Sequence, residues 1–539
     1  MKFLHQTLTE RKMTLFEYLL IFVTAIIPLF FNHPYRINLF LAWEGAFRIA
    51  SGEIPYRDFG SPVGYAFWLL PALFFKIFGP YVYTLLVVQA FINIVSGTIF
   101  RGILKLFVIP APVRLLSLLV FCLSYSMFNF WPWYNHLVFV FEIAGLYFLC
   151  TAILKPILFR KNFNVVLSAF FIALSFMTKQ DTGALGFCIA IALLIFDFIL
   201  ERNFKTALIF IASYLVFMAI LIVPFLQYEF SYWFNMGQFP HYARVDKFDI
   251  ISEFLGGSDA IKFYLLFIIV IVVLKYREAG SFKADKTFFI FAFLVICILG
   301  QATIIQVTSY TPLDGNIYFH SFAFAFLMCF FSRYVDTGRV WQLSMYALLV
   351  CLWWSGVFWN RFLKERVQKI LVDNRDEREH VISKRTYLLS GDTTLRSNRS
   401  KWIVPDVASF KNVRVPESTA EGIQKIMELP ESKNKNMKML NMSELTPLAY
   451  DMGYELEKGP SYPLWFHKGV SFFDREVDYF CDKISNKEYD LILFEDIPNV
   501  NQFYPYEVQS CIKQHYKLKF KFLAPRVPEI CYIEVYTKQ

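Results

Sequence analysis

The stretch Ala42–Tyr65, which follows the first long apolar segment, concentrates residue types suited to acid–base and phosphate chemistry. Its charged side chains are Glu44, Arg48, Glu53, Arg57 and Asp58. Desolvation near a membrane surface can raise the pKa of a carboxyl group, which prepares it to remove a proton from a hydroxyl. A guanidinium group matches the geometry of phosphate oxygens. The connection is also longer than two membrane helices need, and long ordered connections are usually functional.

Each of these residues also has a plain structural interpretation. Glu44 or Asp58 is either a general base, with a neighbouring carboxylate that orients it or binds a metal, or a solvated loop residue. Arg57 directly precedes Asp58, so it either binds a phosphate or forms a local ion pair. Arg48 follows Glu44 by four residues, and on a helix this spacing favours an i,i+4 ion pair.

Three further candidates lie near the ends of apolar segments. Lys179 belongs to a tight turn, where it either meets a lipid phosphate or extends its charged end to the interface. Tyr318 and His320 begin a later apolar segment, where an ionisable side chain is functional or interfacial. Glu142 lies deeper in another segment, and we expect a structural hydrogen bond to satisfy it. Zinc-type cysteine spacing, P-loop, GxGxxG and HExxH motifs are all missing from the sequence.

The composition requires a membrane around most of the chain. Of its 539 residues 56% are hydrophobic, which is far above a soluble domain. Apolar runs with short charged connections fill residues 1–360, whereas residues 361–539 are ordinary soluble sequence. We therefore expect a polytopic α-helical membrane domain over 1–360, with an outer loop at 32–64, and a soluble domain over 361–539. The net charge of +9 reflects loop lysines and arginines rather than a nucleic-acid-binding patch.

Eleven apolar segments are expected to cross the membrane. They lie near residues 15–31, 81–100, 115–131, 136–154, 163–178, 183–200, 206–226, 261–275, 287–306, 316–332 and 341–359. Connections rich in Lys and Arg alternate with connections poor in them, so the positive-inside rule puts the N-terminus in the cytoplasm. An odd number of spans then puts the loop 32–64 and the C-terminal domain outside. The shorter stretch 65–78 is expected to be an interfacial or re-entrant helix.

The C-terminal region has the alternation of strands and helices that is typical of an α/β domain. After a charged helical stretch at 361–385, we expect strands near 437–441, 490–494 and 530–536, and helices near 443–452, 474–484 and 505–514. The region contains Cys481, Cys511 and Cys531, and one disulfide can form among them if this domain lies outside the cytoplasm. A second long outer connection, 227–260, carries His241, Arg244 and Asp246.

The pattern EGAFRIASGEIPYRDFGSPVGYAFWLLPALFFKIFG resembles the first outer loop of the GT-C superfamily of integral-membrane glycosyltransferases, such as aminoarabinose and protein mannosyl transferases. YNHLVFVFEIAGLYFL, FMTKQDTGALG and YFHSFAFAF are similar to other parts of that family. The resemblance implies transfer of a sugar from a polyprenyl-phosphate carrier to a glycan, lipid or protein acceptor. It implies an inverting reaction on the outer face of a bacterial cytoplasmic (inner) membrane, with Asp58 or Glu44 as base. The residues expected to bind substrate are Arg57, Lys179, Tyr318 and His320.

Two departures from the family pattern change which residues are favoured as the base and as the phosphate-binding groups. Many members carry Asp-Glu where this chain has Trp43-Glu44, which favours Asp58 as the base. Relatives often have Lys-Pro-Pro where this chain reads Ser61-Pro62-Val63, so Arg57 or Lys179 is expected to bind the phosphate instead. A transporter or flippase, or a polymerase or ligase of lipid-linked glycans, is an alternative. We would expect a transporter to place charged residues or broken helices at mid-membrane, often within two repeated halves of the chain. No motif in the sequence requires a cofactor, and the carboxylates of the outer loop are compatible with a divalent cation.

Overall fold

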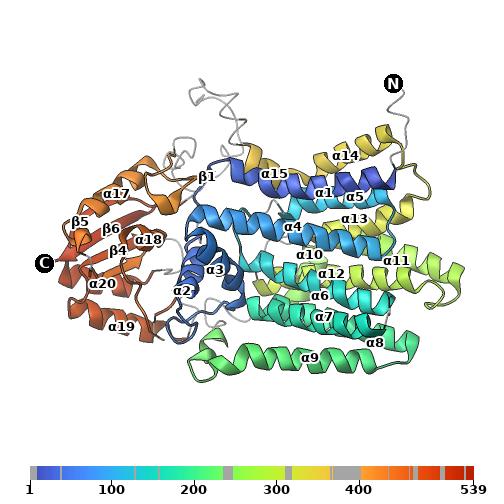
Figure 1. Ribbon diagram of the computed structural model, residues 1–539, viewed down its shortest axis with the longest axis horizontal. Helices are drawn as coiled ribbons and strands as arrows, with labels where there is room; N and C mark the ends of the chain where they lie inside the picture. Colours follow the sequence, from blue (N-terminus) through green and yellow to red (C-terminus); the bar gives the residue numbers. More distant parts are fainter. Residues whose placement is uncertain are drawn as a thin grey trace.

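The computed structural model describes residues 9–36, 39–126, 129–155, 158–234, 247–309, 318–364, 367, 402–434, 436–459, 462–464, 466, 471–497, 504–526 and 530–539. Long helices run roughly side by side through most of the molecule, and a small mixed sheet with its own helices covers one end of them (Figure 1). The protein is therefore a polytopic α-helical membrane protein with a C-terminal α/β unit, as the sequence predicts.

Each of the eleven predicted spans overlaps a helix. These are α1 (Glu10–Ile26), α4 (Val82–Leu106), α5 (Ala111–Phe121), α6 (Tyr134–Leu154), α7 (Leu158–Thr178), α8 (Gln180–Glu201), α9 (Lys205–Ile222), α11 (Asp259–Ala279), α12 (Lys286–Ser309), α13 (Tyr318–Phe331) and α14 (Val340–Trp354). Within the described ranges, seven helices are long and apolar enough to cross a membrane. The number rises to eight if α10 (Lys247–Gly256) and α11, which meet at 81°, form one broken span. Since α5, α13 and α14 are shorter, a total of eleven stays a prediction.

The surfaces of the outer helices are apolar, as a lipid environment requires. On α9, for example, Leu208, Leu215 and Ile220 are all exposed. A soluble protein rarely leaves such a continuous apolar surface uncovered. The protein is thus an integral membrane protein.

The predicted outer loop 32–64 contains a buried helix, α2 (Leu39–Ala50), which is followed by α3 (Ala66–Phe78). The two helices pack closely, because Trp68 donates a hydrogen bond through Nε1 to the carbonyl oxygen of Leu41 at 2.8 Å. A side chain at Gly45 would meet the ring of Trp68 at 2.3 Å, so only glycine allows this approach. Both helices lie between the long membrane helices and the C-terminal sheet (Figure 1).

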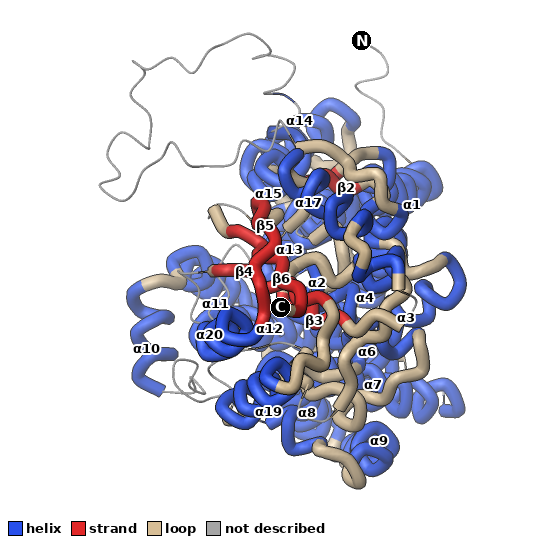
Figure 2. The backbone as a smooth tube through the Cα atoms, turned by 90° about the vertical axis from the view of Figure 1, so that its left-hand side faces the viewer, coloured by secondary structure: helices blue, strands red, loops and turns tan. Residues whose placement is uncertain are grey.

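The C-terminal sheet has the strand order β3-β4-β6-β5. Its strands are β3 (Met439–Met442), β4 (Leu491–Asp496), β5 (Tyr516–Leu523) and β6 (Tyr532–Lys538). The β3–β4 pair is parallel, whereas β4–β6 and β5–β6 are antiparallel. Helix α17 (Glu417–Glu428) lies on one side of the sheet, and α19 (Phe473–Ser485) and α20 (Tyr506–His515) lie on the other (Figure 2). The prediction omitted β5, whose outward lysines hide its strand character.

One disulfide stabilises the C-terminal unit, and one short strand pair joins that unit to the outer loop. A disulfide joins Cys481 of α19 to Cys511 of α20. Strand β1 (His33–Pro34) of the outer loop pairs in parallel with β2 (Val413–Arg414). The expected helix at 361–385 lies outside the described residues, apart from positions 361–364 and 367.

Candidate functional site

Three segments that are distant in sequence meet at the end of the helical body that the sheet covers. Gly60 donates a backbone hydrogen bond to Tyr462 at 2.8 Å and accepts one from Leu464 at 2.9 Å, which joins the outer loop to the C-terminal unit. Gly64 lies directly against the C-terminal end of α7, since a side chain there would meet the carbonyl oxygen of Met177 at 1.8 Å. The end of the outer loop at Gly64 therefore packs against the end of α7, two residues before Lys179.

Glu44 is fully engaged in a buried ion pair. Arg48 donates to its Oε1 atom through Nε at 2.9 Å and Nη2 at 2.8 Å, and Tyr462 donates to the same atom at 3.1 Å. Arg48 also donates through Nη1 to Glu53 at 2.7 Å. The predicted i,i+4 pair is confirmed. Arg48 has no exposed side-chain surface and that of Glu44 is 2% exposed, so this carboxylate is shielded from an acceptor in solvent.

The charge balance of this buried triad is uneven, because one guanidinium group faces two carboxylates. Burial disfavours the charged form of Arg48, but Glu44, Tyr462 and Glu53 together outweigh that effect and raise the pKa of the guanidinium. Burial raises the pKa of Glu53, although Arg48 counteracts the shift. The triad holds α2 against the C-terminal unit, since Arg48 also donates to the carbonyl oxygen of Glu457 at 2.9 Å.

Asp58 is the most exposed of the three loop carboxylates. Arg57 binds it with two parallel hydrogen bonds, Nε to Oδ1 at 2.9 Å and Nη2 to Oδ2 at 2.7 Å, and the amide of Ile54 donates to Oδ2 at 2.7 Å. The local ion pair is confirmed. Partial burial acts to raise the pKa of Asp58, but the hydrogen bonds from Arg57 and Ile54 outweigh it and lower the pKa. Asp58 is therefore ionised at neutral pH and can accept a proton.

Lys179 precedes α8 and lies beside a carboxylate. Its Nζ atom is 3.2 Å from Oδ1 of Asp181 and 6.0 Å from the ring centre of Tyr134. Asp181 also accepts hydrogen bonds from the amide of Thr182 at 2.7 Å and from the hydroxyl of Thr308 at 2.9 Å. The turn thus presents one lysine and one aspartate that remain partly exposed.

Tyr318 is linked to this turn through buried polar groups. Its hydroxyl donates to Oε1 of Gln301 at 3.1 Å, and Nε2 of Gln301 donates to Glu142 at 2.7 Å. The structural hydrogen bond expected for Glu142 is confirmed. Gln301 also lies 3.5 Å from the carbonyl oxygen of Thr182. The network therefore runs from Tyr318 to the residues next to Asp181.

His320 does not share this hydrogen-bonded network. Its Nδ1 atom pairs with the hydroxyl of Tyr264 at 2.8 Å, on α11 rather than α8. The structure thus brings Lys179 and Tyr318 toward one another, and gives Glu44, Asp58 and His320 separate surroundings. The binding and catalytic roles of all six residues stay predictions.

No family model and no curated protein matches the sequence. Solved structures do match it. The crystal structure of ArnT from Cupriavidus metallidurans in the apo state has a TM-score of 0.51 at 11% identity, over 95% of this chain and 96% of ArnT. The structure of the same protein bound to undecaprenyl phosphate has a TM-score of 0.53 at 10% identity, over 97% of both chains. The chain has the GT-C fold. At these identities the likeness concerns the fold.

The GT-C fold here contains polar contacts that the sequence did not reveal. Arg475 of α19 binds Glu229 of the second outer connection with two hydrogen bonds, at 2.6 and 3.0 Å. The hydroxyl of Tyr232 donates to Oε1 of Glu476. Burial raises the pKa of Glu476 from 4.5 to about 8. Glu476 lies in an otherwise ordinary amphipathic helix, so no local pattern identifies it.

Asp181 is the missed residue that sequence reasoning came closest to finding. It follows Lys179 by two positions in a turn between two apolar segments, which is a signal in itself. In the part of the GT-C fold that the structure describes, no group of three or more His, Cys, Asp or Glu is placed to hold a metal ion. His241, Arg244 and Asp246 lie outside the described residues.

Proposed function

We propose that this protein is a membrane glycosyltransferase that moves a sugar from a polyprenyl-phosphate carrier to a glycan, lipid or protein acceptor on the outer face of the membrane. The observation that carries the proposal is the GT-C fold, which this chain shares over 97% of its length with ArnT bound to undecaprenyl phosphate. Residues 1–360 form the membrane domain, and residues 361–539 the outer domain.

Asp58 is the base in this proposal. A base must reach the acceptor hydroxyl, and the exposed fractions of the Glu44, Glu53 and Asp58 side chains are 2%, 9% and 16%. Asp58 takes the proton of the acceptor hydroxyl, whose oxygen attacks the anomeric carbon from the side opposite the phosphate. The new glycosidic bond forms as the bond to the phosphate oxygen breaks, so the configuration inverts. The polyprenyl phosphate leaves with the bonding electron pair.

Arg57 and Lys179 bind the phosphate of the donor. Arg57 is 45% exposed and holds Asp58 through one side of its guanidinium group, which leaves further N–H donors available for an anion. Lys179 contributes a second positive charge next to Asp181. Positive groups that are already in position stabilise the negative charge that develops on the leaving phosphate. Tyr318 and His320 contact the donor from the membrane side.

The reaction takes place outside the cytoplasm of a bacterium, with the N-terminus inside. The disulfide between Cys481 and Cys511 supports this orientation, because disulfides persist in oxidising compartments and are rare in the cytoplasm. The basic connections lie at the opposite ends of the helices, which the positive-inside rule assigns to the cytoplasm.

The test uses purified protein in detergent with a panel of radiolabelled polyprenyl-phosphate sugars, and measures both donor binding and donor consumption. We expect Asp58→Asn to keep donor binding and to lose turnover by about 10²–10⁴-fold, which is the usual contribution of a general base. Glu44→Gln is the matched control, since it also replaces a loop carboxylate by its amide. If Glu44→Gln alone abolishes turnover, the base is Glu44. If both variants turn over normally, the site is wrong, and donor movement across vesicles without consumption would indicate a transporter.

A further inference from the structure

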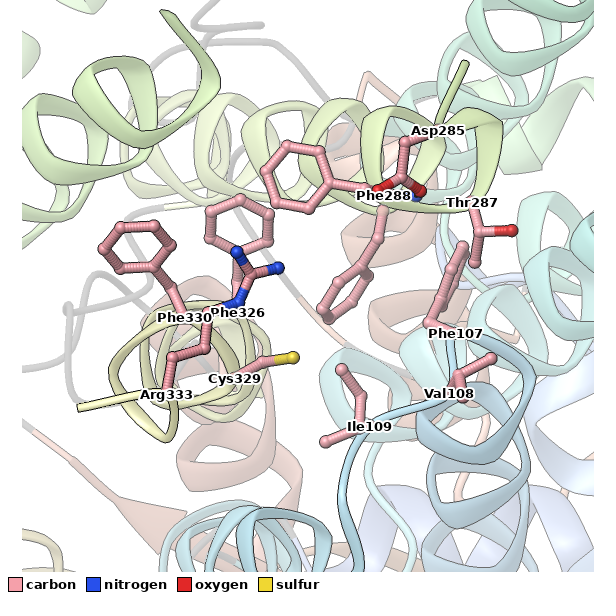
Figure 3. Close-up of a pocket in the computed structure, with 11 residues that line it drawn as sticks. Phe107, Val108, Ile109, Asp285, Thr287, Phe288, Phe326, Cys329, Phe330 and Arg333 are labelled. Carbon is pink, nitrogen blue, oxygen red and sulfur yellow. The ribbon is translucent and has the colours of Figure 1, made fainter. Parts of the chain in front are cut away.

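A cavity with a volume of about 340 Å³ lies between α12, α13 and the turn after α4. Volumes of this size, from about 300 Å³, are typical of small-molecule sites. Figure 3 shows Phe326 and Phe330 of α13, with Arg333 just after its end, on one side, and Phe107 and Ile109 on the other. The cavity plays no part in the proposed transfer reaction.

The cavity lies at the end of the helices that is far from the C-terminal unit. Helix α4 begins next to that unit, where the hydroxyl groups of Tyr81 and Tyr450 are 3.4 Å apart. Its 25 residues carry the chain about 37 Å to Leu106, immediately before the cavity. The cavity is therefore separated from the candidate site by about the thickness of a membrane.

Arg333 supplies a positive charge that has no ion pair among the described residues. Its guanidinium carbon lies 5.9 Å from the ring centre of Phe330, within the range of a cation–π contact. The other charged residue of the lining, Asp285, already has partners within the protein. It accepts a hydrogen bond from the amide of Phe288 at 3.2 Å and lies 3.9 Å from Nζ of Lys275. The net preference of the cavity is therefore for an anion.

Five phenylalanine side chains form much of the rest of the lining, which is completed by Val108, Ile109, Thr287 and Cys329. Phe291 stacks on Phe107 with ring centres 4.6 Å apart and lies 5.6 Å from Phe326. All three rings are buried and form the floor of the cavity. At its edge Val108 has a φ of +59°, which is strained for a β-branched residue, and its side chain is exposed. Strained backbone of this kind often accompanies a binding function.

We propose that this cavity binds the headgroup of an anionic phospholipid from the leaflet opposite the C-terminal unit. The phosphate contacts Arg333, and the glycerol backbone and first acyl carbons lie on the phenylalanine floor. A headgroup at this depth places its acyl chains along the apolar helix surfaces. A small soluble anion would leave the aromatic floor uncovered, so the lining favours a lipid.

The experiment is native mass spectrometry of the full-length protein, equilibrated with either phosphatidylglycerol or zwitterionic phosphatidylcholine. We expect the protein to retain phosphatidylglycerol in preference to phosphatidylcholine, and Arg333→Gln to weaken that preference about fivefold, as expected for one arginine near a membrane surface. Arg339→Gln is the matched control, because Arg339 is also exposed but is paired with Asp336 at 2.9 Å. It is expected to keep the preference.

A second variant tests the cavity without removing the charge. Cys329→Leu narrows the cavity and is expected to reduce retention of phosphatidylglycerol while Arg333 is intact. Equal preference in the wild-type protein and Arg333→Gln would overturn the proposal. So would Arg333-dependent binding of glycerol phosphate in detergent alone, since that result would assign the cavity to a soluble phosphate compound. Arg333 is exposed, so its replacement leaves the packing of α13 intact.

Discussion

Arg48 compensates two buried carboxylates at once, and its contribution therefore exceeds that of a surface ion pair. It binds Glu44 and Glu53 while its guanidinium carbon lies 4.4 Å from the ring centre of Tyr462. We expect Arg48→Met to leave Glu44 buried without its counter-ion and Glu53 with only Lys458, whose Nζ lies 3.9 Å away, at a cost of about 3–5 kcal/mol. Thermal unfolding in detergent measures this cost. The control is Arg57→Met, because Arg57 is exposed and its loss is expected to leave the midpoint unchanged.

Glu476 makes stability depend on pH in a direction that is unusual for a carboxylate. The native protein keeps this proton up to about pH 8, whereas the unfolded chain releases it near 4.5. The native state therefore binds more protons between these values, and the free energy of unfolding falls as the pH rises through this range. The hydrogen bond from Tyr232 and the charge of Arg475 lower the pKa of this carboxyl group, but burial outweighs them and Glu229 adds to the rise.

We expect unfolding midpoints of the wild type to decrease more steeply than those of Glu476→Gln between about pH 5 and pH 8. Glutamine keeps an acceptor for the hydroxyl of Tyr232 but does not titrate, so the difference between the two curves isolates Glu476. Parallel curves would show that Glu476 is ionised in the native state at neutral pH.

Local spacing explains which residue contacts could be predicted from the sequence. Glu44 and Arg48 are one helical turn apart, and Arg57 and Asp58 are adjacent, so both pairs follow from short-range geometry. The pair Arg475–Glu229 joins positions 246 residues apart. Such a contact depends on how the C-terminal unit docks, and no pattern within either segment encodes that docking.

At the scale of elements, close packing of the outer loop against α7 positions the candidate site. Gly64 allows this approach, because a Cβ atom there would meet the backbone oxygen of Met177. We expect Gly64→Ala to cost about 1–3 kcal/mol of stability, as overpacked sites usually do. It should also reduce turnover, since the loop would move away from Lys179. Gly256→Ala in α10 is the control, because no atom lies within 4 Å of its added carbon. Equal stability of the two variants would contradict this packing.

The elements themselves were predictable to different degrees. Long apolar runs identified the membrane helices, since only a helix satisfies its backbone within lipid. The sequence predicts a folded loop where α2 lies, because glycines and prolines follow it closely, at Gly52, Pro55, Gly60, Pro62 and Gly64. Strand β5 was missed because lysines occupy its exposed positions, where they protect an edge strand from pairing with other chains.

At the scale of the whole molecule, the two ends of the helical body differ in chemistry. One end carries the disulfide, the sheet and the outer loops. The other end carries basic residues next to helix ends, including Lys105, Lys283 and Arg333. This difference between the two ends explains why the Lys and Arg content of successive connections predicts one consistent topology. It also separates the proposed transfer site from the proposed lipid site.

The orientation can be tested with two serine-to-cysteine variants on opposite ends. Ser485 lies at the end of α19 and Ser281 lies between α11 and α12, and both are exposed. In intact cells, we expect a membrane-impermeant maleimide to label Ser485→Cys, and to label Ser281→Cys only after the membrane is permeabilised. The wild type provides the background from its native cysteines. The reverse pattern would place the C-terminal unit in the cytoplasm, where the Cys481–Cys511 disulfide would be reduced and transfer on the outer face could not occur.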